Sequence, residues 1–428
     1  MAGGNEGRKR IRIEQVCIGL HIKLDSWLGH PFLLSSFKIK NEQQIAALKS
    51  MGLTEIEYLP GKSDTGPAPM PAAGDPNAPA APLSDNDAAE LEALMREKKA
   101  RIETLNHERE LIRSAERKYL KTANGVKNVM RLANNRPGQA AQLSGEIAGE
   151  LAEIFLSEQN IYIHLMGDNI ADESAYFHSL NVTVLSLILA RAVGVDGAEA
   201  MRDIAQGALM HDVGKAALPS QLLLKDEDLT TAETNLLQMH PAYGIKLMQS
   251  VQTLPGRVRQ VILFHHETVD GSGYPKGLKT DTVDQAVRIV AIANAYDNLC
   301  NQRVAKRSKT PSEALSHMYR NELAKYDEAA LPAFIKALGI YPPGTVVKLA
   351  SGKVGIVMSV DSDDILNPNL MIYDPSIPNH EAAVVNLKRD LDDAIERTLR
   401  PAALPEPIHK YLSPRKRICY FVDHAGAG

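Results

Sequence analysis

The sequence predicts a mainly α protein: an all-helical central domain, a small α/β module before it and a small β appendage after it. Three observations predict this. Apolar residues between positions 121 and 340 recur at the spacing of half-buried helices, as in GEIAGELAEIFL and HSLNVTVLSLILARAV, with no strand-like alternation between them. Residues 11–60 combine short strand-like runs with one helix. After Pro342-Pro343-Gly344 the runs become short and rich in valine and isoleucine.

Composition limits the class of protein. The chain has 428 residues, 44% of them hydrophobic, which suits two to four domains with real cores. A net charge of −4, one Trp and 5% aromatic residues argue against a protein that coats nucleic acid. The longest apolar run, Val182 to Val195, contains Ser186 and Arg191, so no membrane span is expected. No apolar segment follows MAGGNEGRKR, and three well-separated cysteines fit a reducing compartment, so we expect a cytoplasmic protein.

The N-terminal part divides into a module and a linker. Residues 1–60 form the predicted α/β module, with strands at Ile13–Leu24 and Phe32–Lys40 and a helix capped by Asn41. The module has a regulatory role, in sensing or docking, or is a plain scaffold. Residues 61–86 are rich in Pro and Ala and predict a semi-rigid linker.

A helical connector is expected at 87–150. One seven-residue spacing relates Leu91, Leu105, Ile112 and Tyr119. This spacing indicates half of a coiled coil, hence a homodimer through the 89–120 helix. The alternative is a long helix packed on the next domain, because Arg109 and Glu116 occupy positions that should be apolar.

The remaining chain is assigned to the central domain at 151–340 and to a β appendage with a C-terminal tail at 341–428. Short strands are expected until about residue 388. We expect a helix or an irregular tail beyond it, with the basic cluster at 414–417 as a solvated surface.

Histidines and aspartates are concentrated in one part of the central domain. The candidate metal ligands are His178, His211, Asp212, His240, His265, His266 and Asp297. Imidazole and carboxylate groups bind borderline divalent metals. Seven ligands exceed the need of one ion, so we expect two ions that share a bridging carboxylate. The alternative is a set of unrelated surface histidines.

The sequence His211-Asp212-Val213-Gly214-Lys215 follows an apolar helical run. Adjacent helical residues project about 100° apart, so the Asp can offer one oxygen to each ion. Gly214 is expected to allow a sharp turn, and Lys215 to hold an anionic phosphoryl oxygen. Two metal ions lower the pKa of a bridging water, and the resulting hydroxide attacks phosphorus. The pattern therefore predicts hydrolysis of a phosphate ester.

A second motif starts at His265-His266-Glu267. We expect the histidines to ligate neighbouring ions and Glu267 to orient one of them. The loop at 270–275 contains two glycines and a proline and is expected to form a wall of the metal pocket.

These motifs carry a family resemblance. HDVGK at 211–215, with His178 before it, resembles the HD superfamily of metal-dependent phosphohydrolases, and HHETVDGSGYP at 265–275 resembles its HD-GYP subgroup. The N-terminal module resembles the uncharacterised region that often precedes HD-GYP domains. The resemblance implies an all-helical HD-type catalytic domain and a bacterial phosphodiesterase that converts cyclic di-GMP to pGpG, GMP or both.

The resemblance also implies roles for residues. Two divalent ions, iron or manganese, are bound by the seven candidate ligands, with Asp212 as the bridge. Asp212 and Lys215 are the implied catalytic residues. The implied substrate contacts are Lys215, Gly273, Tyr274, Pro275, Arg303, Lys306 and Lys309.

Three positions depart from the family pattern. Ser174 stands where some members have a Glu that binds a third ion, which favours two ions here. After Asp297, Arg303 is kept but Lys306 replaces the usual Arg and the Pro-Tyr pair is absent; Asn294 stands where Asp is common. The altered segment leaves two rival hypotheses: a non-catalytic effector that binds a cyclic dinucleotide and signals to protein partners, or a phosphohydrolase for another nucleotide.

Overall fold

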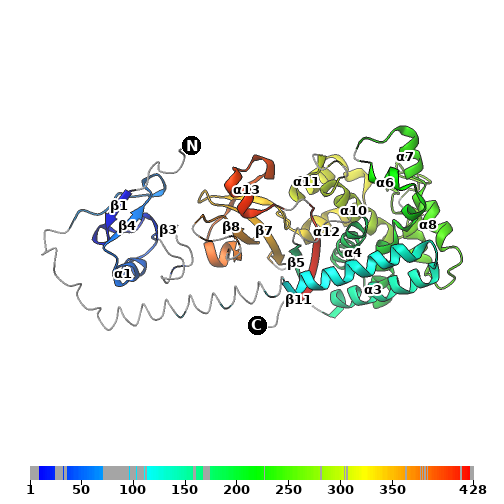
Figure 1. Ribbon diagram of the computed structural model, residues 1–428, viewed down its shortest axis with the longest axis horizontal. Helices are drawn as coiled ribbons and strands as arrows, with labels where there is room; N and C mark the ends of the chain where they lie inside the picture. Colours follow the sequence, from blue (N-terminus) through cyan, green and yellow to red (C-terminus); the bar gives the residue numbers. More distant parts are fainter. Residues whose placement is uncertain are drawn as a thin grey trace. The chain divides into compact units, whose positions relative to one another are not determined.

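The computed structural model describes residues 9–24, 32, 36–70, 96, 103, 110, 113–157, 161–166, 174–225, 227–279, 282–302, 304, 307–361, 364–375, 377, 379, 382, 384–414 and 417–424. The chain divides into two compact units, one of residues 1–108 with 374–382 and one of residues 109–373 with 383–428 (Figure 1). The predicted fold class, mainly α with small sheets in the N-terminal and C-terminal parts, is confirmed.

The N-terminal unit contains a four-stranded antiparallel sheet in the order β1-β4-β2-β3. Its elements are β1 (Lys9–Arg12), η1 (Ile13–Gln15), β2 (His21–Lys23), β3 (Ser36–Lys38), α1 (Glu42–Ser50), β4 (Glu55–Tyr58) and η2 (Pro60–Lys62). Asn41 caps α1 by accepting a hydrogen bond from the Gln44 N–H. The prediction of one strand over Ile13–Leu24 is wrong. The chain forms a 3₁₀ turn there and then bends at Gly19, whose φ of 92° favours glycine.

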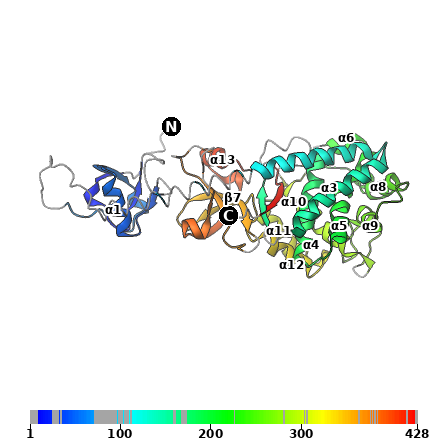
Figure 2. The same ribbon diagram turned by 90° about the horizontal axis from the view of Figure 1, so that it is seen from below.

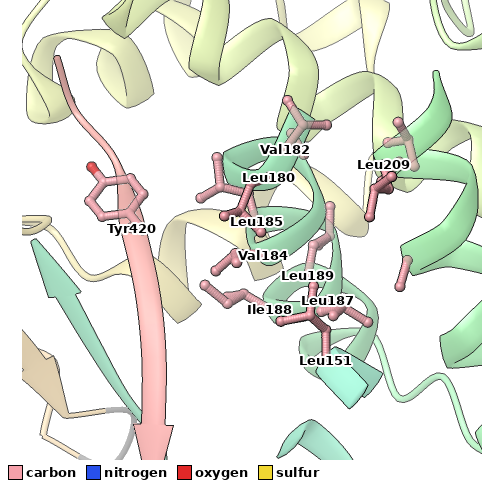
Figure 3. Close-up of a cluster of buried hydrophobic side chains, with 14 of the residues drawn as sticks. Leu151, Leu180, Val182, Val184, Leu185, Leu187, Ile188, Leu189, Leu209 and Tyr420 are labelled. Carbon is pink, nitrogen blue, oxygen red and sulfur yellow. The ribbon is translucent and has the colours of Figure 1, made fainter. Parts of the chain in front are cut away.

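The larger unit is built on a bundle of helices (Figure 2). Residues 113–133 are helical, and the bundle continues with α3 (Pro137–Ser157), α4 (Ser174–Ala192), α5 (Ala198–Met210), η4 (Val213–Ala217), α6 (Ser220–Leu224), α7 (Thr231–Leu237), α8 (His240–Met248), α9 (Gly256–Phe264), α10 (Gln285–Cys300), α11 (Pro311–Asn321), η7 (Leu323–Lys325) and α12 (Ala330–Leu338). Helix α4 is central, packing against α3, α5, α10 and α12. Its residues 179–190 are all buried, and Figure 3 shows the cluster of apolar side chains among them. The buried set also includes the polar residues Ser179, Asn181, Thr183 and Ser186.

An antiparallel sheet, whose strands come from distant parts of the sequence, completes the larger unit. It contains β5 (Ile161–Leu165), β6 (Val346–Leu349), β7 (Val354–Asp361), β8 (Asn369–Ile372), β9 (Val384–Asn386), β10 (Ile395–Leu399) and β11 (Tyr420–His424). The main path runs β10-β6-β7-β5-β11, while β8 pairs with β7 and β9. The shorter elements η9 (Leu387–Leu391), η10 (Pro401–Ala403) and α13 (Glu406–Leu412) connect the last strands.

Two expectations about this sheet are wrong. A strand, β5, interrupts the stretch expected to be all helix, and the expected tail contributes β10 and β11. β5 pairs with β7 and β11, and β10 pairs with β6, all far apart in sequence. The strand preference of a short segment depends on such neighbours more than on its own composition.

Most of the predicted 89–120 helix lies outside the described residues. Its last part, from 113, is helical, and Tyr119 there is fully buried against Phe177 and Phe421. Tyr119, one residue of the seven-residue spacing, therefore packs within the chain. This contact agrees with the alternative, in which a long helix packs on the next domain. Among the described helices, none is both long enough and apolar enough to cross a membrane.

Candidate metal centre

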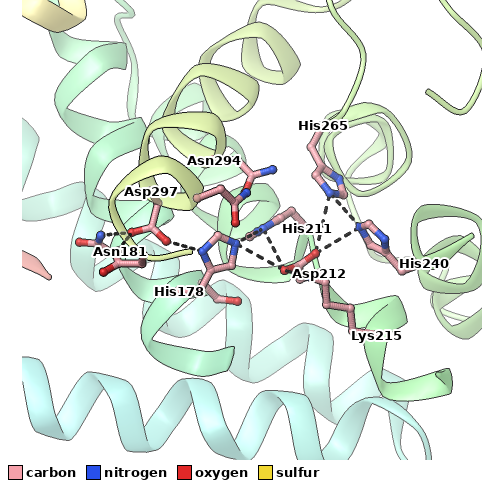
Figure 4. Close-up of polar contacts among 12 residues, drawn as sticks. His178, Asn181, His211, Asp212, Lys215, His240, His265, Asn294 and Asp297 are labelled. Atoms are coloured by element: carbon pink, nitrogen blue, oxygen red, sulfur yellow. Dashed lines mark hydrogen bonds and ion pairs between the residues drawn. The ribbon is translucent and has the colours of Figure 1, made fainter. Parts of the chain in front are cut away.

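The centre is assembled mostly from the ends of helices. His211 follows the last residue of α5, His240 begins α8, and His265 directly follows α9. His178 lies inside α4, and Asp212 precedes the short helix η4. In Figure 4 these side chains converge on one carboxylate.

Asp212 presents each carboxylate oxygen to a different set of histidines. Its Oδ2 lies 3.5 Å from His178 Nε2 and 3.4 Å from His211 Nε2. Its Oδ1 lies 3.2 Å from His240 Nε2 and 3.9 Å from His265 Nε2. The possible ligand atoms form two groups that share Asp212: one with His178 and His211, the other with His240, His265 and His266. The hypothesis of unrelated surface histidines is thus excluded, because the residues are close together and largely buried.

Three histidines use the same backbone contact. The Nδ1 atoms of His211 and His240 lie 2.6 Å and 2.7 Å from the carbonyl oxygens of Ala208 and Leu237, three residues earlier. His265 Nδ1 lies 3.1 Å from the oxygen of Ile262, again three residues earlier. A carbonyl only accepts, so Nδ1 carries the proton and the Nε2 lone pair faces the centre.

The donor set fits metal ions. The Nε2 atoms of His178 and His211 lie 3.2 Å apart, and those of His240 and His265 lie 3.1 Å apart. Two lone pairs at such a distance repel unless a cation lies between them. Asp212 Oδ1 is moreover buried and accepts no hydrogen bond from the described residues. A bound cation would satisfy all of these atoms.

The protonation states agree with that donor set. Burial lowers the pKa of His211 and lowers the pKa values of His265 and His266 further. Burial alone would raise the pKa of Asp212, but Lys215 and His211 more than offset it and hold the pKa well below its ordinary value. The imidazoles of His211, His265 and His266 are therefore neutral and the Asp212 carboxylate is charged near neutral pH, as metal binding requires.

The motif after Asp212 supplies a cation, Lys215, and a glycine, Gly214, that is needed for close packing. Lys215 Nζ lies 2.5 Å from Asp212 Oδ2, and its side chain is 32% exposed, so the amine borders both the centre and solvent. Gly214 was expected to allow a sharp turn; its φ is not positive, so the turn itself does not require glycine. A Cβ at Gly214 would lie 1.8 Å from the His240 carbonyl oxygen, so glycine is needed for the close approach of α8.

The loop after the two adjacent histidines folds back on them. A Cβ at Gly273 would lie 2.4 Å from the His266 carbonyl oxygen, and the Tyr274 N–H donates to that oxygen at 3.2 Å. The Tyr274 ring stacks on the His266 imidazole with centroids 4.4 Å apart. Glu267 does not orient a histidine, contrary to expectation. Its carboxylate accepts hydrogen bonds from the backbone N–H groups of Lys276 and Leu278 and so anchors the loop.

Gly273, Tyr274 and Pro275 thus belong to a loop that supports His266. Their predicted contact with substrate stays a prediction.

Asp297 lies beside the centre but outside both groups. Its Oδ2 is 2.5 Å from His178 Nδ1, where it accepts a hydrogen bond from the ring. Direct ligation by Asp297 therefore stays a prediction. Asn294 is buried on the same helix and accepts a hydrogen bond from Asn298 at 2.8 Å.

Of the phosphate contacts predicted after Asp297, the structure describes Lys309 alone. Arg303 and Lys306 lie outside the described residues. Lys309 lines a cavity of about 680 Å³ together with Arg320 and Arg400, and none of the centre's histidines lines that cavity.

Sequence reasoning missed two residues, Asn181 and Asn301, which donate hydrogen bonds to Asp297. Their spacing was visible, since Asn181 lies three residues after His178 and Asn301 four residues after Asp297. Their other partners, the backbone groups of Ile418 and Tyr420, could not be found from any spacing.

Comparison with known proteins identifies this part of the chain. A family described as "HD domain" matches residues 164–330, which contain the whole centre. The chain carries an HD domain. A second family, "Domain of unknown function (DUF3391)", matches residues 8–142, ahead of the HD domain.

Three curated relatives resemble the chain. A cyclic di-GMP phosphodiesterase of Pseudomonas aeruginosa is 29% identical over 85% of this chain and 85% of its own length. The cyclic di-GMP phosphodiesterase response regulator RpfG of Xanthomonas campestris is 37% identical over 32% of this chain and 37% of its own. The 3'3'-cGAMP-specific phosphodiesterase 3 of Vibrio cholerae is 30% identical over 39% of this chain and 35% of its own.

HD-domain chemistry depends on divalent metal, and the clustered His and Asp side chains of this HD domain can hold it.

Proposed function

We propose that the protein is a metal-dependent phosphodiesterase that hydrolyses cyclic di-GMP to pGpG, GMP or both. The observation that carries the proposal is Asp212, whose two oxygens face two different sets of buried histidines. The likeness to the Pseudomonas enzyme over most of both chains supports cyclic di-GMP as the substrate.

The centre is proposed to hold two divalent ions, iron or manganese, with Asp212 as the bridge. The proposed ligands are His178, His211, Asp212, His240, His265, His266 and Asp297. Ions in such a pair lower the pKa of water and balance charge on phosphoryl oxygens. Neutral imidazoles with their Nε2 lone pairs directed inward suit these ions, and so does a carboxylate kept ionised by Lys215.

Lys215 is the proposed phosphate-binding cation. Its amine lies at the border of the centre, paired with Asp212, and it is long enough to reach a phosphoryl oxygen there. Tyr274 and the loop around it are proposed to keep the His266 ring in place, because the two rings stack.

The test is metal analysis of the anaerobically purified full chain, coupled to product chromatography with cyclic di-GMP. We expect about two metal equivalents and the appearance of pGpG or GMP. A chain that holds its metals but releases no product would refute the enzyme and favour the non-catalytic effector, which calorimetry of nucleotide binding would then identify.

A second substrate is worth including because one relative is named for 3'3'-cGAMP. The same chromatography with 3'3'-cGAMP, in competition with cyclic di-GMP, decides between them. Faster turnover of 3'3'-cGAMP would change the proposed substrate and leave the proposed chemistry in place.

The homodimer through residues 89–120, the regulatory role of the N-terminal module and the signalling partners remain proposals. Light scattering of the full chain, compared with a chain that starts at residue 109, tests the dimer.

A further inference from the structure

Two asparagines fix one oxygen of Asp297, and Figure 4 shows one of them, Asn181, beside it. Asn181 Nδ2 donates to Asp297 Oδ1, and Asn301 Nδ2 donates to the same oxygen at 2.9 Å. The other oxygen, Oδ2, faces His178 Nδ1. Because Oδ1 is occupied by two amide donors, only Oδ2 is left for the centre.

Both amides are anchored to the backbone at the start of β11. Asn181 donates to the Ile418 carbonyl at 3.1 Å and accepts from the Tyr420 N–H at 2.7 Å. Asn301 donates to the same carbonyl at 2.9 Å and accepts from the Ile418 N–H at 2.8 Å. Each amide oxygen meets a backbone donor and each amide nitrogen meets only acceptors, so both side chains have one orientation.

The anchor lies far outside the matched HD domain. That match ends at residue 330, whereas the anchoring backbone belongs to residues 418–420. Strand β11 pairs with β5, which pairs with β7, so the anchor is held by the C-terminal sheet. Ile418 and Tyr420 are themselves buried.

We propose that the backbone of residues 418–420, acting through Asn181 and Asn301, is a positioning part of the metal centre. It holds the Asp297 carboxylate, which in turn sets the ring orientation and the tautomer of His178. The inference rests on the metal centre of the proposed function and goes beyond it, because it places a determinant of metal affinity in the C-terminal sheet.

The test replaces Asn301 in the full chain and measures Co²⁺ binding. Asn301→Asp keeps the shape of the side chain and its acceptor for the Ile418 N–H, but turns an oxygen toward Asp297. Loss of groups that support metal ligands lowers metal affinity roughly 10- to 100-fold, and we expect a loss in that range here. Asn301→Ser, which adds no charge, should lose about 10-fold. Affinity is measured by competition with a chromophoric chelator, and the Co²⁺ absorption spectrum should change with the geometry of the site.

Asn367→Asp is the matched control. The Asn367 amide also donates to a carboxylate, Asp364 Oδ1 at 2.7 Å, but in the loop between β7 and β8 and outside this network. The same chemical change should therefore leave Co²⁺ affinity and spectrum as in the wild type.

The outcomes separate this inference from the proposed function. Wild-type Co²⁺ affinity and spectrum in both Asn301 variants would overturn the inference; if Asn301→Asp does not fold, Asn301→Ser decides. A wild-type chain that binds Co²⁺ but hydrolyses no cyclic dinucleotide with iron or manganese would refute only the proposed function. A wild-type chain that binds no Co²⁺ would overturn both.

Discussion

Gly214→Ala tests whether the close approach of η4 and α8 builds the centre. The added Cβ would lie 1.8 Å from the His240 carbonyl oxygen and 2.4 Å from the Gly244 nitrogen, whereas ordinary contact begins at 3.4 Å. Both atoms belong to the backbone, so no side chain can rotate away. Helix α8 must move, and His240, its first residue, moves with it.

The expected loss of folding stability follows from this clash. Overpacking a core typically costs 1–3 kcal/mol, and a backbone clash belongs at about 3 kcal/mol. For a domain of this size that corresponds to a fall in melting temperature of roughly 6–12 °C. Circular dichroism at 222 nm measures the melting temperature, and elemental analysis measures the metal content, which should fall as well.

Gly149→Ala is the control, because it is a mid-helix glycine of α3 whose Cβ would meet Arg202 Nε at an ordinary 3.5 Å. It should stabilise the chain by about 0.5–1 kcal/mol through helix propensity. The reasoning fails if Gly214→Ala melts like the wild type and keeps its full metal content.

Three further predictions concern the centre itself. Asp212→Ala should abolish binding of both ions, because its two oxygens face both groups of ligands; two metal equivalents by elemental analysis would contradict the bridge. Lys215→Ala should keep the metals but lower turnover on the order of 10²-fold, as for other lost transition-state donors, and unchanged kcat would exclude its phosphate role. The metal-free chain should lose stability as pH falls below about 6.5, because the unfolded histidines then bind protons while those with a lowered pKa, such as His265, do not. Melting temperatures of the apoprotein at several pH values check this, and a melting temperature that rises with acidification would contradict it.

The sequence indicated which residues gather at the centre better than it indicated the contacts that hold them in place. The pairs at 211–212 and 265–266 mark the ends of α5 and α9 with ligand side chains, whereas His178 and His240 were added as single residues. The function of Gly214 was misjudged because a close approach between elements depends on where α8 packs, which no local pattern contains. The role of Glu267 was misjudged for the same reason, since its partners are backbone groups of a loop that folds back on it.

The positions of the histidines in their helices differ, and His178 alone of these four is oriented by Asp297 rather than by a carbonyl group three residues earlier. His211, His240 and His265 follow the last turn of a helix, where carbonyl groups lack intrahelical partners, and each uses the carbonyl three residues earlier to fix its Nδ1 proton. His178 lies inside α4, where carbonyl groups already accept hydrogen bonds from the helix backbone. The Nδ1 proton of His178 is instead accepted from outside the helix, by Asp297.

A carboxylate buried beside a helix must in turn be satisfied, because an unpaired buried charge is costly. Asn181 and Asn301 meet that need at Oδ1, and their own remaining groups are satisfied by the backbone of Ile418 and Tyr420. A continuous chain of hydrogen bonds thus links His178, in the interior of α4, to the C-terminal strand. The same argument predicts that the other three histidines do not depend on that strand.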